Sequence, residues 1–121
     1  MKIFRKTIIS LCIVLFFTYH SAYAGIFINE IMYSLDGGDE DREWIEIYND
    51  ADVSMDLSSF SFFEAKTNHK LVLVQGNKNI GAQGYVVIID DPIKFKTDWP
   101  NFVGTIFDSS FSLSNSGETL A

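Results

Sequence analysis

The chain has 121 residues, of which 47% are hydrophobic and 15% aromatic, and its formal net charge at pH 7 is −7. Nucleic-acid phosphates and anionic membrane surfaces are bound by Lys and Arg, so this acidic balance argues against both as direct partners. It fits solubility outside the cell, a basic partner or divalent cations. A chain of this length is expected to form one domain.

The first 24 residues have the layout of a secretory signal peptide. Three basic residues precede the apolar run 8–17, and small residues end at Ala24, ahead of Gly25. This order predicts cleavage between Ala24 and Gly25. The apolar run is shorter than the about 20 residues that a spanning helix needs, which argues against an uncleaved anchor. We therefore expect an exported protein, periplasmic, secreted or at the cell surface, without a membrane span after cleavage.

Cleavage leaves residues 25–121 as the mature domain and removes the single cysteine, Cys12. Without a thiol the domain has no disulfide framework, so its stability must come from packing. Three of the nine basic residues also leave, so six Lys and Arg remain against sixteen Asp and Glu, a balance of −10.

Residues 25–33 and 43–49 are expected to form the first two strands. Apolar and polar residues alternate in both segments, which is the period of a half-buried strand. In the second segment, Ile45 and Ile47 are expected on one face and Glu46 on the other.

The rest of the chain is expected to form short strands separated by turn residues. The continuous apolar run within 84–90 is typical of a central strand. Residues 92–101 fit either a loop or one helical turn that Pro100 ends. No β–α–β alternation and no repeat is evident, so we expect an antiparallel β-sandwich. The later strands are expected in residues 53–63, 70–74, 84–90 and 103–107.

An acidic loop is expected at residues 35–42, where glycines allow positive φ. Calcium takes several oxygen ligands, and the candidate ligands here are Asp36, Asp39 and Asp41. Their spacing differs from that of an EF-hand, so we favour a solvated loop over a calcium site. No other cofactor is expected.

The mature chain offers little for catalysis. Its one histidine, His69, lies in a turn-like stretch and is expected at the surface. No nucleophile-elbow pattern surrounds any serine, and no His/Cys cluster is present. Glu30 and Glu46 are able to meet across two strands, and we favour hydrogen bonding to loop backbone as their role. We therefore expect no enzyme activity.

Four motifs in order resemble those of the lamin-tail domain family. They are Asn-Glu-Ile-Met-Tyr at 29–33 with Glu-Trp-Ile-Glu-Ile-Tyr-Asn at 43–49, Asp-Leu-Ser-Ser-Phe at 56–60, the strand approach at 80–88, and Leu-Ser-Asn-Ser-Gly-Glu-Thr-Leu at 113–120. The family-motif positions are Asn29, Glu30, Glu43, Trp44, Glu46, Asn49, Leu57, Asn115 and Gly117.

The resemblance implies an immunoglobulin-like sandwich that acts as a non-catalytic binding or scaffolding module. In bacteria, domains of this family occur on exported proteins, often beside nucleases or other hydrolases, where they are thought to serve attachment. The implied partner is a protein or surface polymer outside the cytoplasm. The alternatives are a carbohydrate or cell-wall module that uses exposed Trp99 or Tyr85, and an N-terminal accessory domain of a larger secreted hydrolase or nuclease.

Members of the family continue past the last matched motif with further strands, whereas this sequence ends at Ala121. We therefore expect a sandwich that is incomplete at its C-terminal strands, as in a fragment. An unfinished sheet edge leaves backbone groups unpaired and favours self-association.

Overall fold

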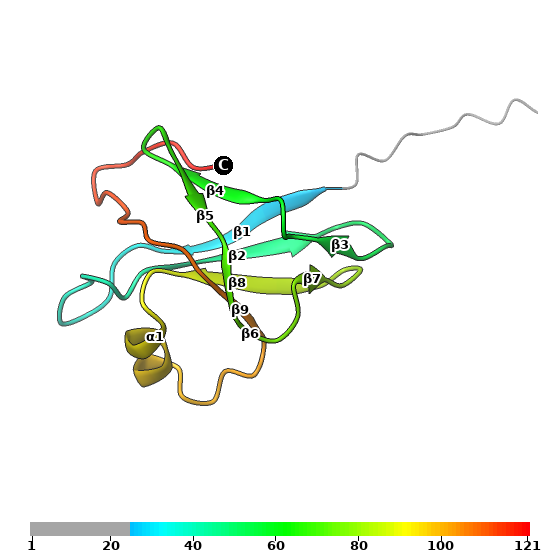
Figure 1. Cartoon of the computed structure of the whole chain (residues 1–121). Coiled ribbons are helices and arrows are strands. Elements are labelled where there is room, and N and C mark those ends of the chain that lie inside the picture. Colours follow the sequence, from blue (N-terminus) through cyan, green and yellow to red (C-terminus); the bar gives the residue numbers. More distant parts are fainter. Residues whose placement is uncertain (1–24) are drawn as a thin grey trace, which may run out of the picture.

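The computed structural model describes residues 25–121, so the signal peptide expected at 1–24 lies outside the described residues. The main sheet is shown in Figure 1. In spatial order, its five strands are β1 (Ile26–Met32), β2 (Trp44–Asn49), β8 (Tyr85–Ile89), β9 (Thr105–Asp108) and β6 (Val72–Gln75).

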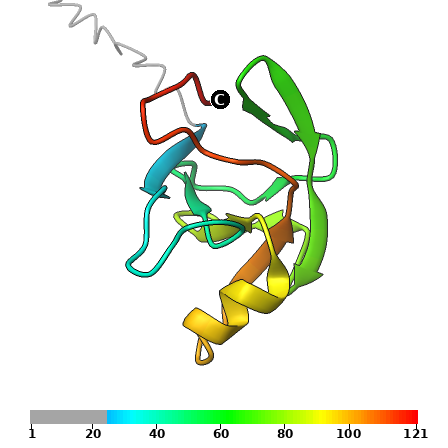
Figure 2. The same ribbon diagram turned by 90° about the vertical axis from the view of Figure 1, so that its left-hand side faces the viewer.

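A second layer covers one face of the main sheet. It contains the hairpin of β4 (Ser61–Glu64) and β5 (Thr67–Lys70) and the short pair of β3 (Met55–Asp56) and β7 (Asn79–Ile80). The last residues join this layer, since Ala121 exchanges backbone hydrogen bonds of 2.7 and 3.0 Å with Phe63. Figure 2 shows the hairpin and the C-terminal segment on the opposite side of the main sheet from the helix. The expected β-sandwich is thus confirmed.

One strand pair departs from the expected antiparallel order. β8 and β9 are parallel, and the chain crosses between them through helix α1 (Pro92–Asp98). The helix resolves the ambiguous stretch 92–101, because Asp91 caps it. The Asp91 carboxylate accepts hydrogen bonds from the backbone N–H groups of Ile93 and Lys94 at 2.7 and 2.8 Å.

The inner core lies between the two layers. Ile45 and Ile47 of β2 point into it, as the alternating pattern predicts, and Leu57 is fully buried there. The inner core is completed by Phe62, Ile80, Val86, Ile88, Phe107, Phe111 and Leu113.

A smaller outer core fills the space between the sheet and α1. Trp44 of β2 and Phe95 of α1 meet there, together with Val87, Ile89 and Ile106. Because β8 contributes to both cores, its residues from Val86 to Ile89 are buried on both faces. This double burial explains the continuous apolar run in its sequence.

Asn49 ties two loops together at the end of β2. Its fully buried amide donates to the carbonyls of Val53 and Gly81, both at 2.8 Å, and its Oδ1 accepts from Ala51 N at 3.0 Å. Each of these bonds satisfies a group that is shielded from water, so the side chain fixes the positions of both loops.

We predict that Asn49→Ala lowers the free energy of unfolding by about 2–4 kcal/mol, because it leaves several backbone groups without partners. Urea denaturation measures the change. Asn101→Ala is the matched control, since the Asn101 side chain is exposed. A loss below about 0.5 kcal/mol for Asn49→Ala, the range of neutral surface changes, would contradict this role.

Candidate functional site

Two carboxylates stand opposite each other on the outer face of the main sheet. Glu30 of β1 and Glu46 of β2 are Cα partners, because a bulge after Ile28 shifts the register and leaves Asn29 as the extra residue. The Asn29 amide donates to Glu46 Oε1 at 2.7 Å. This pairing confirms the prediction that Glu30 and Glu46 are able to meet as cross-strand neighbours.

The pairing of Glu30 with Glu46 is electrostatically unfavourable, because like charges directly opposite each other destabilise a sheet. Within residues 25–121, no basic side chain forms an ion pair with either carboxylate. In residues 25–121, neither glutamate is hydrogen-bonded to loop backbone, and Glu46 instead accepts from the Asn29 side chain, so the role expected for them is wrong for the described part of the chain. The structure gives that role to other acids.

These two carboxylates border a cavity of about 290 Å³, which we call the outer cavity. Trp44, Phe95, Trp99 and Phe102 form its aromatic wall. The two indoles meet edge to face, with ring centroids 6.0 Å apart and an interplanar angle of 88°. Trp99 is 42% exposed, whereas Trp44 is buried and its Nε1 has no hydrogen-bond partner among the described residues.

More aromatic side chains lie along the same face. Tyr48 of β2 and Tyr85 of β8 are stacked, with centroids 4.7 Å apart, and Phe27 of β1 lies opposite Tyr48. Tyr85 is 53% exposed and Phe27 is 49% exposed. Since side chains two apart share a face, the order along β2 is Trp44, Glu46 and Tyr48. Along β2, the outer face therefore has the acidic Glu46 between two aromatic residues.

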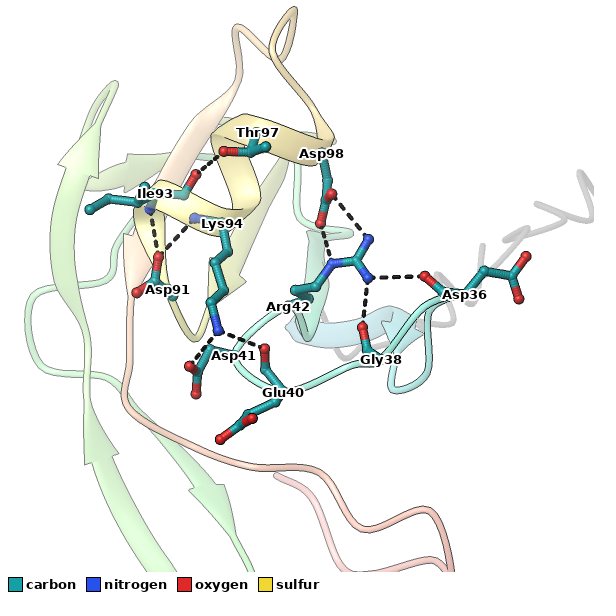
Figure 3. A network of polar contacts seen from close by, with 10 residues as sticks. All are labelled: Asp36, Gly38, Glu40, Asp41, Arg42, Asp91, Ile93, Lys94, Thr97 and Asp98. Atoms are coloured by element: carbon teal, nitrogen blue, oxygen red, sulfur yellow. Dashed lines mark hydrogen bonds and ion pairs between the residues drawn. The ribbon is translucent and has the colours of Figure 1, made fainter.

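The acidic loop is held against α1 by Arg42 (Figure 3). Its guanidinium donates to both carboxylate oxygens of Asp98, at 2.8 and 3.0 Å. It also donates to the carbonyls of Gly38 and Asp36, at 2.6 and 3.1 Å. The hydrogen bond from Arg42 lowers the pKa of the Asp98 carboxyl.

The loop does not gather the three calcium candidates. The Asp41 carboxylate binds Lys94 Nζ at 2.7 Å, and Asp39 accepts from Asn115 Nδ2 at 3.1 Å. In Figure 3 the Asp36 carboxylate points away from the loop contacts. Among residues 25–121, no three His, Cys, Asp or Glu side chains converge in a way that suits a metal ion. The arrangement therefore does not support a calcium site.

Two other acids hold the segment that follows β9. Glu43 is only 5% exposed, and its Oε2 accepts the Leu113 N–H at 2.6 Å. Asp90 Oδ1 accepts the Phe111 N–H at 3.2 Å. Burial raises the pKa of both carboxyl groups. No local pattern pointed to these bonds, because Glu43 and Leu113 are 70 positions apart in the chain.

The sequence predicted His69 at the surface, but in the structure its side chain is partly buried. Its side chain is 18% exposed, and its Nε2 lies 3.0 Å from Glu64 Oε2 in the β4–β5 hairpin. Burial raises the pKa of Glu64, and the neighbouring Glu118 acts in the same direction. No serine hydroxyl in the described part of the chain is hydrogen-bonded to His69. The histidine thus packs as part of a hairpin rather than beside a nucleophile.

The last motif forms a tight turn. Gly117 adopts a φ of 92°, and its N–H bonds to Ser114 O at 3.1 Å. This left-handed conformation explains the glycine. The preceding Asn115 bonds to Asp39, so the turn also contacts the acidic loop.

The two layers of sheet enclose the inner core, which defines an immunoglobulin-like β-sandwich domain. The candidate site lies on the outer face of the main sheet. The family model for the Lamin Tail Domain matches residues 20–121, and the chain belongs to this family of non-catalytic domains. No curated protein and no solved structure matches it significantly. Between residues 25 and 121, no helix has the length and apolarity needed to cross a membrane.

We predict that Glu43→Gln makes stability less dependent on pH. Burial raises the pKa of Glu43 in the folded protein. The folded state therefore keeps a proton that the unfolded chain, with a pKa of about 4.3, has already lost. The contribution of Glu43 to the free energy of unfolding is highest below that pKa and falls as pH rises through the raised one.

Glutamine keeps an acceptor for the Leu113 N–H but does not titrate. Urea denaturation between pH 4 and 8 should show Glu43→Gln gaining stability relative to the wild type as pH rises. The exposed Asp52→Asn is the control for the loss of one charge. Parallel pH profiles of Glu43→Gln and the wild type would contradict the prediction.

Proposed function

We propose that this protein is an exported binding module that attaches to a protein partner outside the cytoplasm and has no catalytic activity. The observation that carries the proposal is the outer face of the main sheet. It exposes Phe27, Tyr85 and Trp99 beside carboxylates for which the described chain supplies no cation. Clustered exposed aromatic groups mark interaction surfaces, because leaving them in water is unfavourable.

Membership of a non-catalytic family supports the absence of enzyme activity, and the signal-type N-terminus supports export. The charge of the mature domain favours a basic partner, since opposite potentials steer association.

A carbohydrate polymer is the second candidate partner. It is favoured by one specific observation: Trp99 and Tyr85, the aromatic residues first considered for sugar binding, share the outer face. Stacked or flanking aromatic rings offer flat apolar surfaces with polar neighbours, which suits a sugar ring as well as a protein side chain.

A second copy of the chain is a further candidate partner, through the edge of the main sheet. The edge strand β6 exposes three consecutive apolar residues, Val72, Leu73 and Val74. Uncharged exposed edges favour pairing between sheets. The expected unfinished edge near the C-terminus is partly occupied, since Ala121 pairs with Phe63.

Export is tested with the full chain carrying a C-terminal tag, expressed in its own host. We expect the wild-type product to begin at Gly25 and to appear outside the cytoplasm. Ala24→Phe should block processing, because the position before the cleavage site requires a small residue. Intact-mass measurement identifies the N-terminus. Gly25→Ala is the control that should still be cleaved. A cytoplasmic product that begins at Met1 would contradict the proposal.

Attachment is tested by sedimenting the purified protein with envelopes of the producing cells. We expect protease treatment of the envelopes to abolish attachment and periodate treatment to leave it intact, because the proposed partner is a protein. Loss after periodate alone, together with loss in Trp99→Ala, would identify the carbohydrate partner. Absence of attachment to untreated envelopes would refute the module's role.

Self-association is tested by light scattering over a range of concentrations. We expect a dimer that weakens in Leu73→Lys, because a charge on an edge strand opposes pairing. Val53→Lys is the control, since Val53 is an apolar loop residue that is also exposed, at 65% against 43% for Leu73. A monomer at every concentration would exclude this interaction.

A further inference from the structure

We propose that the outer cavity binds the guanidinium group of an arginine residue in the partner protein. This inference rests on the proposed function, whose partner it describes more closely. It starts from the carboxylates of Glu30 and Glu46, which lie on neighbouring strands and border the same cavity.

The first argument is the missing positive charge. Directly opposite side chains in an antiparallel pair have Cβ atoms about 4.5–5.5 Å apart, so the two carboxylates repel each other. Within residues 25–121, Arg42 pairs with Asp98 and Lys94 with Asp41, and no basic side chain pairs with Glu30 or Glu46. A cation from outside would turn the repulsion into two attractions.

The second argument is the aromatic wall. A cation within about 6 Å of an indole centroid is attracted by the negative face of the ring, and Trp gives the strongest interaction of this kind. Trp99 is partly exposed at the cavity and Trp44 lies behind it, so an entering group meets indole surface beside the carboxylates. Aromatic and acidic groups together select an organic cation over a neutral apolar group.

The third argument decides between kinds of cation. A divalent metal such as calcium needs six to eight oxygen ligands, and no cluster of three or more suitable side chains exists in the described part of the chain. A guanidinium is flat, stacks on aromatic rings and presents five donors in a fork that two carboxylates are able to share. Arginine therefore fits better than the compact ammonium of lysine.

A fourth observation favours arginine within a peptide. Trp44 lines the outer cavity, and its Nε1–H is a buried donor without an acceptor among the described residues. A peptide brings backbone carbonyl groups together with its cation. A backbone carbonyl is the kind of acceptor that this donor lacks, whereas a free cation supplies none.

The chain provides its own reporter for the test. It contains two tryptophans, and both line the outer cavity. Binding there should change intrinsic fluorescence. The probe is the capped peptide Gly-Arg-Gly, compared with Gly-citrulline-Gly, which has nearly the same shape but no charge, and with Gly-Lys-Gly.

We expect a saturable change with the arginine peptide, binding at least about tenfold weaker with the citrulline peptide, and an intermediate affinity with the lysine peptide. The double variant Glu30→Gln/Glu46→Gln should lose at least about tenfold in affinity for the arginine peptide. Glu40→Gln/Asp52→Asn removes the same charge from exposed positions elsewhere and should stay within about twofold of the wild type. Near-ultraviolet circular dichroism checks that each variant is folded.

Equal binding of the arginine and citrulline peptides, or unchanged affinity in Glu30→Gln/Glu46→Gln, would overturn the inference. So would a fluorescence change with an N-acetylglucosamine oligomer but none with the arginine peptide. If Glu30→Gln/Glu46→Gln does not fold, Trp99→Leu is tested by isothermal titration, because it removes the stacking ring and keeps both carboxylates; unchanged affinity for the arginine peptide would then overturn the inference.

The outcome also separates this inference from the proposed function. If attachment to envelopes is protease-sensitive but the arginine peptide does not bind, the module attaches through another surface. If the peptide binds but the protein does not attach to envelopes, arginine binding in the outer cavity is supported and the proposed attachment function is refuted.

Discussion

Buried hydrogen bonds at the two ends of β2 hold the sandwich together. At one end, Glu43 accepts the Leu113 N–H and fixes the segment after β9. At the other end, Asn49 binds backbone groups of two loops. A buried polar group without a hydrogen-bond partner costs free energy. Burying Glu43 and Asn49 is therefore favourable only when the distant segments that they bind are in place. Both sets of bonds thus help to fix the segments that enclose the inner core.

The alternation of β2 between these ends creates two surfaces of different kinds. Its inward side chains Ile45 and Ile47 complete the inner core. Its outward side chains begin under α1 with Trp44, continue with Glu46 and end with Tyr48. Because α1 has only seven residues, it covers one end of the outer face and leaves the rest open. The open part is where a partner is able to reach aromatic rings and carboxylates together.

Three groups of acids in the described chain have different roles. Glu43 and Asp90 are buried and hold backbone, at the cost that burial raises the pKa of each carboxyl group. Asp41 and Asp98 pair with Lys94 and Arg42, in contacts that solvent screens and that mainly order the loop. Glu30 and Glu46 have no such partner in the described chain. This distribution is why the outer face, rather than the acidic loop, is the candidate for recognition.

The sequence by itself determined the elements whose patterns are local. Alternation predicted the faces of β2, the apolar run predicted the central position of β8, and the ordered motifs predicted the family. Only the tertiary structure decided that β8 and β9 are parallel, that Glu43 meets Leu113 and that Trp99 packs on Trp44. The facing of Glu30 and Glu46 depends on the bulge at Asn29, since a shift of one residue moves a side chain to the other face. Such features depend on contacts between distant segments, which no local periodicity records.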